Sequence, residues 1–181
     1  MSNSAEISRY SPAEESLNVT SHAIGLVLSI GALVALLRHT IPMDDARLAI
    51  SFCVFGLSLI FLYATSTAYH GSKNQARRGR LRILDHVSIY ILIAGTYTPF
   101  TLITLHGPTG WMIFGASWGM AFTGIILKFF FTGKYRLLST LMYVFMGWLI
   151  VFAIWALRHE SVRASTRRLW DSFLHPKIVV P

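Results

Sequence analysis

Long runs without a formal charge alternate with short charged connections along most of the chain. A transmembrane helix needs about 20 mostly apolar residues, because each residue adds about 1.5 Å to a helix that must cross about 30 Å of hydrocarbon. Five segments fit this description: 19–37, 48–69, 83–105, 111–127 and 137–157. A connection rich in glycine and proline separates the third from the fourth. The pattern therefore predicts an all-α, polytopic transmembrane helical bundle with about five spans.

Two flanking segments complete the predicted organisation. Residues 1–18 form a polar N-terminal segment, within which Ser11-Pro12-Ala13-Glu14 is typical of a capping box at the start of a helix. An interfacial helix is therefore expected to lead into the first span. Residues 158–181 form a basic tail whose apolar residues fit a helix on the membrane surface rather than another span.

Composition and charge add an orientation to this picture. The chain is 54% hydrophobic and 13% charged, with a formal net charge of +8, and the charged fraction is about half that of a soluble domain. Lys and Arg accumulate in the cytoplasmic loops of membrane proteins, and here they collect in two connections: Lys73, Arg77, Arg78, Arg80 and Arg82, then Lys128, Lys134 and Arg136. The N-terminus is therefore predicted to be cytoplasmic. Because topology explains the basic charge, no nucleic-acid partner is expected.

Polar residues of three helices are predicted to meet at the cytoplasmic membrane face. Ser66 and His70 are four residues apart near the end of the second span, so they share a helical face. Asp85 enters the third span beside the same basic connection, and an acid inside a span normally faces the bundle interior and has a partner. Three residues lie on one face of the helix that leads into the first span. Together these residues are called the polar cluster: Glu15, Asn18, His22, Ser66, His70 and Asp85.

The residue types of the polar cluster leave two interpretations open. Imidazole and carboxylate groups with a hydroxyl nearby can bind zinc, which makes a bound water nucleophilic near neutral pH. The alternative is a hydrogen-bonded polar layer that fixes how the helices pack, and for the residues of the first helix a solvated interfacial face. His86 is predicted to pack or hydrogen-bond toward Tyr90 one turn on, with a metal-ligand role as its alternative. Tyr97 and Pro99 predict a polar packing contact and a kink in the third span.

Several motifs in this order resemble one family. They are Glu14-Glu15-x-x-Asn18, Ser21-His22-x-x-Gly25, Ser66-x-x-x-His70, Asp85-His86-x-x-Ile89-Tyr90, Ala94-Gly95-Thr96-Tyr97-Thr98-Pro99-Phe100 and Met146-Gly147-Trp148-Leu149. Over roughly residues 11–150 the chain resembles the hemolysin III family, the bacterial branch of the progestin and adipoQ receptor superfamily. The resemblance implies a seven-helix bundle in the bacterial inner membrane, with the N-terminus inside.

The resemblance also implies a function for the polar cluster. It implies a zinc ion held by His70 and by two histidines of a seventh helix, with Ser66 and Asp85 close by, and hydrolysis of a lipid amide such as a ceramide. Asp85 would then orient or deprotonate the metal-bound water, and Ser66 would supply a supporting hydrogen bond. Beyond about residue 150 the sequence no longer resembles the family, and the sixth and seventh helices are missing. This departure indicates a truncation or an altered reading frame, in which His22 or a second chain would have to supply a missing ligand.

Two further functions follow from the same resemblance and compete with the hydrolase. The family name reflects a pore-forming, haemolytic activity, which would cause cytolysis through a homo-oligomeric conduit without a metal. A receptor-like membrane sensor would bind a ligand without turnover or leakage. Membrane lipid is the expected partner, and the sequence identifies no specific substrate.

Overall fold

The computed structural model describes residues 11–105, 107–131, 137, 140–151, 154, 155 and 158. Within these residues the chain is helical and contains no strand: α1 (Pro12–Thr40), the short 3-10 helix η2 (Ile41–Met43), α2 (Ala46–Gly71), α3 (Gln75–Pro99), the π-helix η3 (Phe100–Leu105) and α4 (Gly107–Phe131). Four of these helical segments are long and apolar enough to cross a membrane. The predicted all-α membrane bundle is therefore confirmed.

The fifth predicted span is described only in part. A shorter apolar helix covers Thr140–Val151, whereas several residues of the predicted span 137–157 lie outside the described residues. The same holds for most of residues 1–18 and for the tail 158–181 apart from Arg158. The chain divides into two compact units, Met1–Gly147 and Trp148–Pro181, and the polar cluster belongs to the first.

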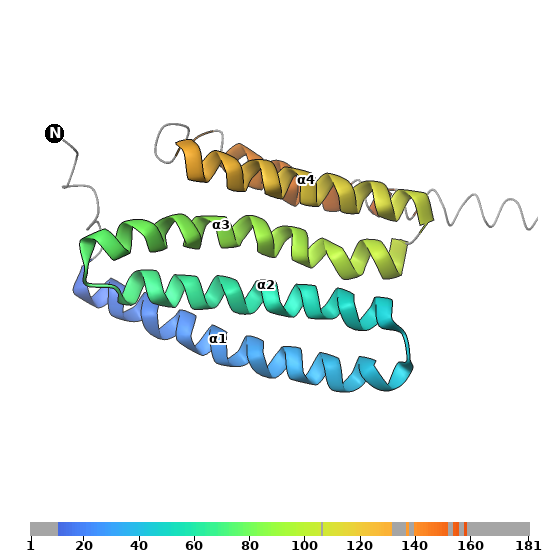
Figure 1. Ribbon diagram of the computed structural model, residues 1–181, viewed down its shortest axis with the longest axis horizontal. Helices are drawn as coiled ribbons and strands as arrows, with labels where there is room; N and C mark the ends of the chain where they lie inside the picture. Colours follow the sequence, from blue (N-terminus) through green and yellow to red (C-terminus); the bar gives the residue numbers. More distant parts are fainter. Residues whose placement is uncertain are drawn as a thin grey trace, which may run out of the picture. The chain divides into compact units, whose positions relative to one another are not determined.

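Consecutive helices of the first unit pack side by side, α1 on α2, α2 on α3 and α3 on α4 (Figure 1). Tight connections produce this order. Asp44 adopts a left-handed conformation with φ of 51° after η2, and the next residue, Asp45, caps α2 by accepting hydrogen bonds from the backbone N–H groups of Arg47 and Leu48. The chain therefore reverses direction at each connection, which brings the start of α1, the end of α2 and the start of α3 to one end of the bundle. This end is called the site end.

Helices α1 and α3 begin well before the hydrophobic segments that predicted them. The capping box is confirmed: Glu14 N–H donates to Ser11 Oγ at 3.3 Å, and Ser11 N–H donates to Glu14 Oε2 at 2.6 Å. Helix α3 has its own N-cap in Asn74, whose side chain accepts from Arg77 N–H at 3.1 Å. As a result, charged residues ahead of both spans are held on helical faces rather than in loops.

The contact between α2 and α3 is close because a glycine faces a serine. A Cβ placed on Gly95 would collide with the Ser58 side chain, so a larger residue would force the two helices apart. Ser58 itself is buried and donates to the carbonyl of Phe55 in its own helix at 2.7 Å. This approach fixes the spacing between the two helices that carry Ser66, His70 and Asp85.

The far half of α3 shows the predicted polar contact and a change of helix type. Tyr97 Oη donates to the carbonyl of Met146 at 2.9 Å, which confirms a polar packing contact. After Pro99 the α-helix gives way to the π-helix η3, because proline has no N–H to continue the regular ladder. The predicted connection at residues 106–110 is too long: α4 already begins at Gly107, since Pro108 suits the first turn of a helix.

Candidate functional site

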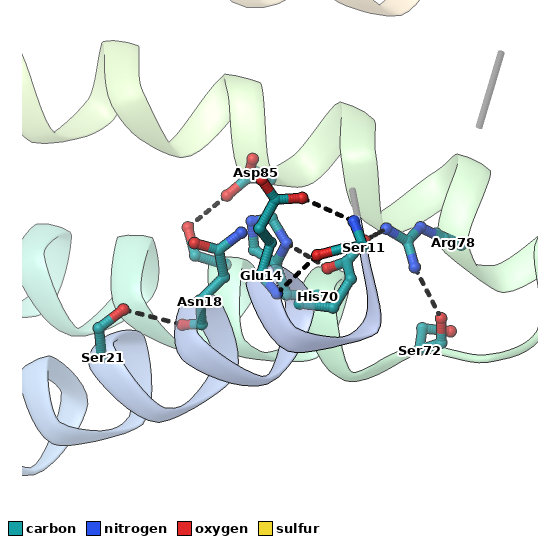
Figure 2. Close-up of polar contacts among 10 residues, drawn as sticks. Ser11, Glu14, Asn18, Ser21, His70, Ser72, Arg78 and Asp85 are labelled. Atoms are coloured by element: carbon teal, nitrogen blue, oxygen red, sulfur yellow. Dashed lines mark hydrogen bonds and ion pairs between the residues drawn. The ribbon is translucent and has the colours of Figure 1, made fainter. Parts of the chain in front are cut away.

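The polar cluster gathers side chains from three helices at the site end. Helix α2 contributes Ser66 and His70 from its last turns, and α3 contributes Asp85 from its first half. The first turns of α1 contribute the remaining members. Figure 2 shows His70 and Asp85 close to the start of α1, with Arg78 of α3 beside them. The cluster thus lies where α1, α2 and α3 meet.

Asp85 has the partner that an acid in a span requires. Ser66 Oγ donates a hydrogen bond to Asp85 Oδ1, which joins α2 to α3. Ser66 is buried, and the main-chain carbonyl of Asp85 accepts from Ser88 Oγ at 2.6 Å. The carboxylate is therefore held between α2 and α3 by Ser66, which lies one helical turn before His70 on α2.

His70 is held by Glu15 from the start of α1. Its Nδ1 lies 2.8 Å from Glu15 Oε2, and both side chains are largely buried, with 11% of His70 and 17% of Glu15 exposed. The other carboxylate oxygen, Glu15 Oε1, accepts a hydrogen bond from Arg78 Nη2. Glu15 therefore bridges an imidazole of α2 and a guanidinium of α3.

Arg78 is the residue of this site that the sequence reasoning missed. The charge pattern predicts a third span that begins at residue 83 and places Arg78 in the basic connection before it. In the structure its guanidinium lies 5.1 Å from the centre of the Tyr69 ring, and its Nη1 is 3.5 Å from the carbonyl of Ser72. The N-cap signal of Asn74 would have extended the helix and placed Arg78 and Asp85, seven residues apart, on one face.

His22 packs against His70 rather than pointing to the same position. The two rings are stacked, with centroids 5.6 Å apart and planes inclined by 14°, and His22 also contacts Tyr63 with centroids 6.1 Å apart. Imidazole binds a metal through a lone pair in the plane of its ring. Nearly parallel, stacked planes do not direct both lone pairs at one ion, so this arrangement makes His22 a support for the His70 ring.

The other two candidates make local contacts. The carbonyl of Asn18 accepts from Ser21 Oγ at 3.1 Å, and Figure 2 shows the Asn18 side chain on the part of α1 that faces the site. His86 Nδ1 lies 2.6 Å from the carbonyl of Arg82, one turn back along α3. The carbonyl of His86 accepts from Tyr143 Oη at 3.1 Å.

The described residues fit one zinc ligand and its supporting carboxylate. A zinc-bound histidine usually donates its second ring N–H to a carboxylate or carbonyl, and the contact between His70 Nδ1 and Glu15 has this form. Nε2 would then be the nitrogen that binds zinc. Catalytic zinc normally has three protein ligands, and among the described residues no three His, Cys, Asp or Glu side chains form a metal-binding group.

Comparison with known proteins places the chain in a family. The model of the family described as "Haemolysin-III related" matches residues 10–175, which is further than the resemblance over residues 11–150. "Hemolysin-3" of Bacillus cereus is 46% identical over 141 residues, and the "Hemolysin-3 homolog" of Bacillus subtilis (strain 168) is 43% identical over 141 residues. Each comparison covers 78% of this chain, but 64% and 66% of the respective relative. The chain thus spans less than two thirds of the length of these relatives.

A more distant relative comes from animals. The "Monocyte to macrophage differentiation factor" of Homo sapiens is 28% identical over 148 residues, which cover 77% of this chain and 60% of that protein. No solved structure matches the chain significantly. The family match covers far more than half of the chain, and the two Bacillus relatives agree with it. The protein therefore belongs to the haemolysin-III related family of membrane proteins.

Proposed function

We propose that the polar cluster is part of a zinc-dependent hydrolase site that acts on a lipid amide at the cytoplasmic face of the bacterial inner membrane. The observation that carries this proposal is the hydrogen bond from Ser66 to Asp85 across α2 and α3, one helical turn from His70. The carboxylate of Asp85, the hydroxyl of Ser66 and the imidazole of His70 thus lie at the same end of the spans. A lipid whose amide lies at the membrane interface would meet these groups without leaving the bilayer.

Each residue has a role in this proposal. Asp85 accepts a proton from the attacking water, and Ser66 orients the carboxylate by donating to one of its oxygens. His70 binds the metal through Nε2. Zinc, when bound, lowers the pKa of its water and polarises the amide carbonyl. The remaining ligands would come from outside the described residues or from a second copy of the chain, which makes a homo-oligomer part of the proposal.

Metal analysis of the purified protein tests the zinc site. Zinc should copurify with the detergent-solubilised chain in stoichiometric amount and should be lost in His70→Ala. His39→Ala is the matched control, because His39 is exposed at the opposite end of α1 and should leave the zinc content unchanged. A wild-type protein without zinc, or equal zinc in both variants, contradicts the proposal.

A vesicle experiment separates the hydrolase from the competing functions. The protein is reconstituted into vesicles that contain a ceramide and enclose a fluorescent dye, and both fatty-acid release and dye release are followed. A hydrolase releases fatty acid, and a chelator or His70→Ala stops this release. The name of the Bacillus relatives motivates the pore, which would release dye in the presence of chelator and from His70→Ala alike. A receptor-like sensor would release neither.

A further inference from the structure

We infer that Glu15 and Arg78 form a positioning pair that holds His70 in the Nδ1-protonated tautomer, with Arg78 fixing Glu15 and Glu15 fixing the ring. The consequence for metal binding rests on the proposed function, whereas the effect on the ring itself does not. Neither residue touches the reacting atoms in this inference. Both act through His70.

The first step is the bridging position of Glu15. One carboxylate oxygen lies 2.8 Å from His70 Nδ1, and the other accepts from Arg78 Nη2. With both oxygens engaged by groups from two other helices, the carboxylate cannot rotate without losing a charge-assisted hydrogen bond. An ionised carboxylate accepts hydrogen bonds and donates none, so a neutral His70 must carry its proton on Nδ1. Its lone pair is then on Nε2.

The second step is the position of Arg78, which differs from that of its neighbours. Arg77 and Arg80 on the same helix are exposed, as expected for charges that only set topology. Only 11% of the Arg78 side chain is exposed, and its Nε is buried without a hydrogen-bond partner among the described residues. Burying that donor is unfavourable, and the contacts with Glu15 and the Tyr69 ring offset the cost. The burial of Arg78 therefore indicates that it is a specific partner of Glu15 and does more than set topology.

The third step is how the ring is held on its faces. His22 stacks on His70 with planes inclined by 14°, and Tyr69 lies against it with centroids 4.7 Å apart. These contacts limit tilting of the imidazole but do not choose which nitrogen carries the proton. Glu15 contacts Nδ1 itself and therefore favours the tautomer protonated there, and the geometry of Glu15 depends on Arg78.

The tautomer can be measured directly in the metal-free protein. The full chain, labelled with ¹⁵N-histidine, is treated with a chelator, and the ring ¹⁵N signals of His70 are recorded by NMR at a pH high enough that the ring is neutral. The wild type should be protonated at Nδ1 and unprotonated at Nε2. Glu15→Ala should shift the ring toward the Nε2-protonated tautomer, whereas Arg77→Ala, the exposed matched control, should keep the wild-type signals.

A double variant guards against misfolding. Glu15→Ala alone leaves Arg78 buried without its carboxylate, so Glu15→Ala/Arg78→Ala removes both charges together and should show the same shift. A wild-type ring that is not protonated at Nδ1 alone, or a double variant with wild-type signals, overturns the inference.

Metal affinity provides the second readout and separates the two proposals. Zinc affinity, measured by competition with a chromophoric chelator, should fall about 10–100-fold in Glu15→Ala, as for other second-sphere partners of metal-binding histidines. Arg78→Ala added to Glu15→Ala should have little further effect, because both residues act through one contact. If His70→Ala abolishes zinc binding while Glu15→Ala binds as tightly as the wild type, the inference fails and the zinc site stands. If the wild type binds no zinc, the proposed function fails, and the tautomer result still decides the positioning role.

Discussion

The middle of the spans and the site end use buried hydroxyl groups in different ways. In the middle, hydroxyl groups donate back to their own helix: Ser29 to Leu26, Ser58 to Phe55, Thr98 to Ala94 and Ser117 to Phe114. At the site end, Thr65 and Ser66 are adjacent on α2 and both buried. Thr65 donates to the carbonyls of Phe61 and Leu62 in its own helix, whereas Ser66 donates to Asp85 of another helix.

This difference shows which polar groups depend on the tertiary structure. A hydroxyl that bonds three or four residues back satisfies itself in any helix, wherever that helix lies. The bonds from Ser66 to Asp85 and from Glu15 to His70 and Arg78 exist only when three helices are correctly placed. Tyr97 also bonds across helices, but to a main-chain carbonyl that any residue would provide. Trp118 Nε1 of α4 also donates to Thr98 Oγ1 of α3 at 3.1 Å, so a side-chain pair between helices exists away from the site end as well. What distinguishes the site end is that its pairs between helices involve ionisable side chains.

The largest effect is expected from Asp85→Asn. The amide can still accept from Ser66, so the helix packing should persist, but the residue can no longer take up a proton. We expect the rate of fatty-acid release from ceramide vesicles to fall by about 10²–10⁴-fold, the usual contribution of a general base. The initial rate, measured at equal amounts of folded protein, checks this.

Asp45→Asn is the matched control at the opposite end of the bundle. Asp45 is exposed and caps α2, and asparagine caps a helix about as well as aspartate. The Asp45→Asn variant should release fatty acid at the same rate as the wild type. If Asp85→Asn also keeps the full rate, the bond between Ser66 and Asp85 only fixes packing, and the polar-layer interpretation of the cluster is correct.

The sequence predicted the all-α membrane bundle, because a helix that crosses the bilayer needs a long stretch with few or no charges. A charge-free stretch, however, indicates only the part of a helix that lies in lipid. Helices α1 and α3 begin at Pro12 and Gln75, which precede the charge-free stretches. The start of α1 was still predicted, since Ser11 and Glu14 form a local capping signal. The start of α3 was missed because the basic residues around Arg78 were attributed to topology.

The site could be predicted as a set of residues but not as a set of contacts. Helical spacing placed Ser66 beside His70, and the cost of a buried acid predicted that Asp85 has a partner. Which helix supplies each partner depends on rotations and offsets between helices, and these follow from packing such as that of Gly95 on Ser58. The link from His70 through Glu15 to Arg78 is of this kind, so helical spacing alone did not reveal it.

A smaller effect, on stability, is expected from the neighbouring hydroxyl groups of α2. Ser66→Ala removes a bond between helices and leaves Asp85 without that donor, so the free energy of unfolding should fall by about 0.6–1.7 kcal/mol. Thr65→Val should change it by less than about 0.5 kcal/mol, because the carbonyls of its own helix keep their backbone partners. Denaturant titration in mixed micelles measures both. If the free energy of unfolding falls equally in the two variants, hydroxyl bonds between helices stabilise the protein no more than hydroxyl bonds within a helix.

The smallest effect on the site is expected from Ser11→Ala, which removes the N-cap of α1. Loss of a capping side chain costs about 1 kcal/mol, concentrated in the first turn. Glu15 N–H bonds to the carbonyl of Ser11 at 3.0 Å, so fraying of this turn loosens the carboxylate that holds His70. Zinc affinity should fall less than in Glu15→Ala, and hydrogen exchange at the backbone amides of Glu14 and Glu15 should become faster.

Asp45→Ala is the control, because it removes the N-cap of α2 at the opposite end of the bundle. It should cause a similar loss of stability but no loss of zinc affinity. If both variants weaken zinc binding equally, general stability rather than the order of the first turn of α1 controls the site.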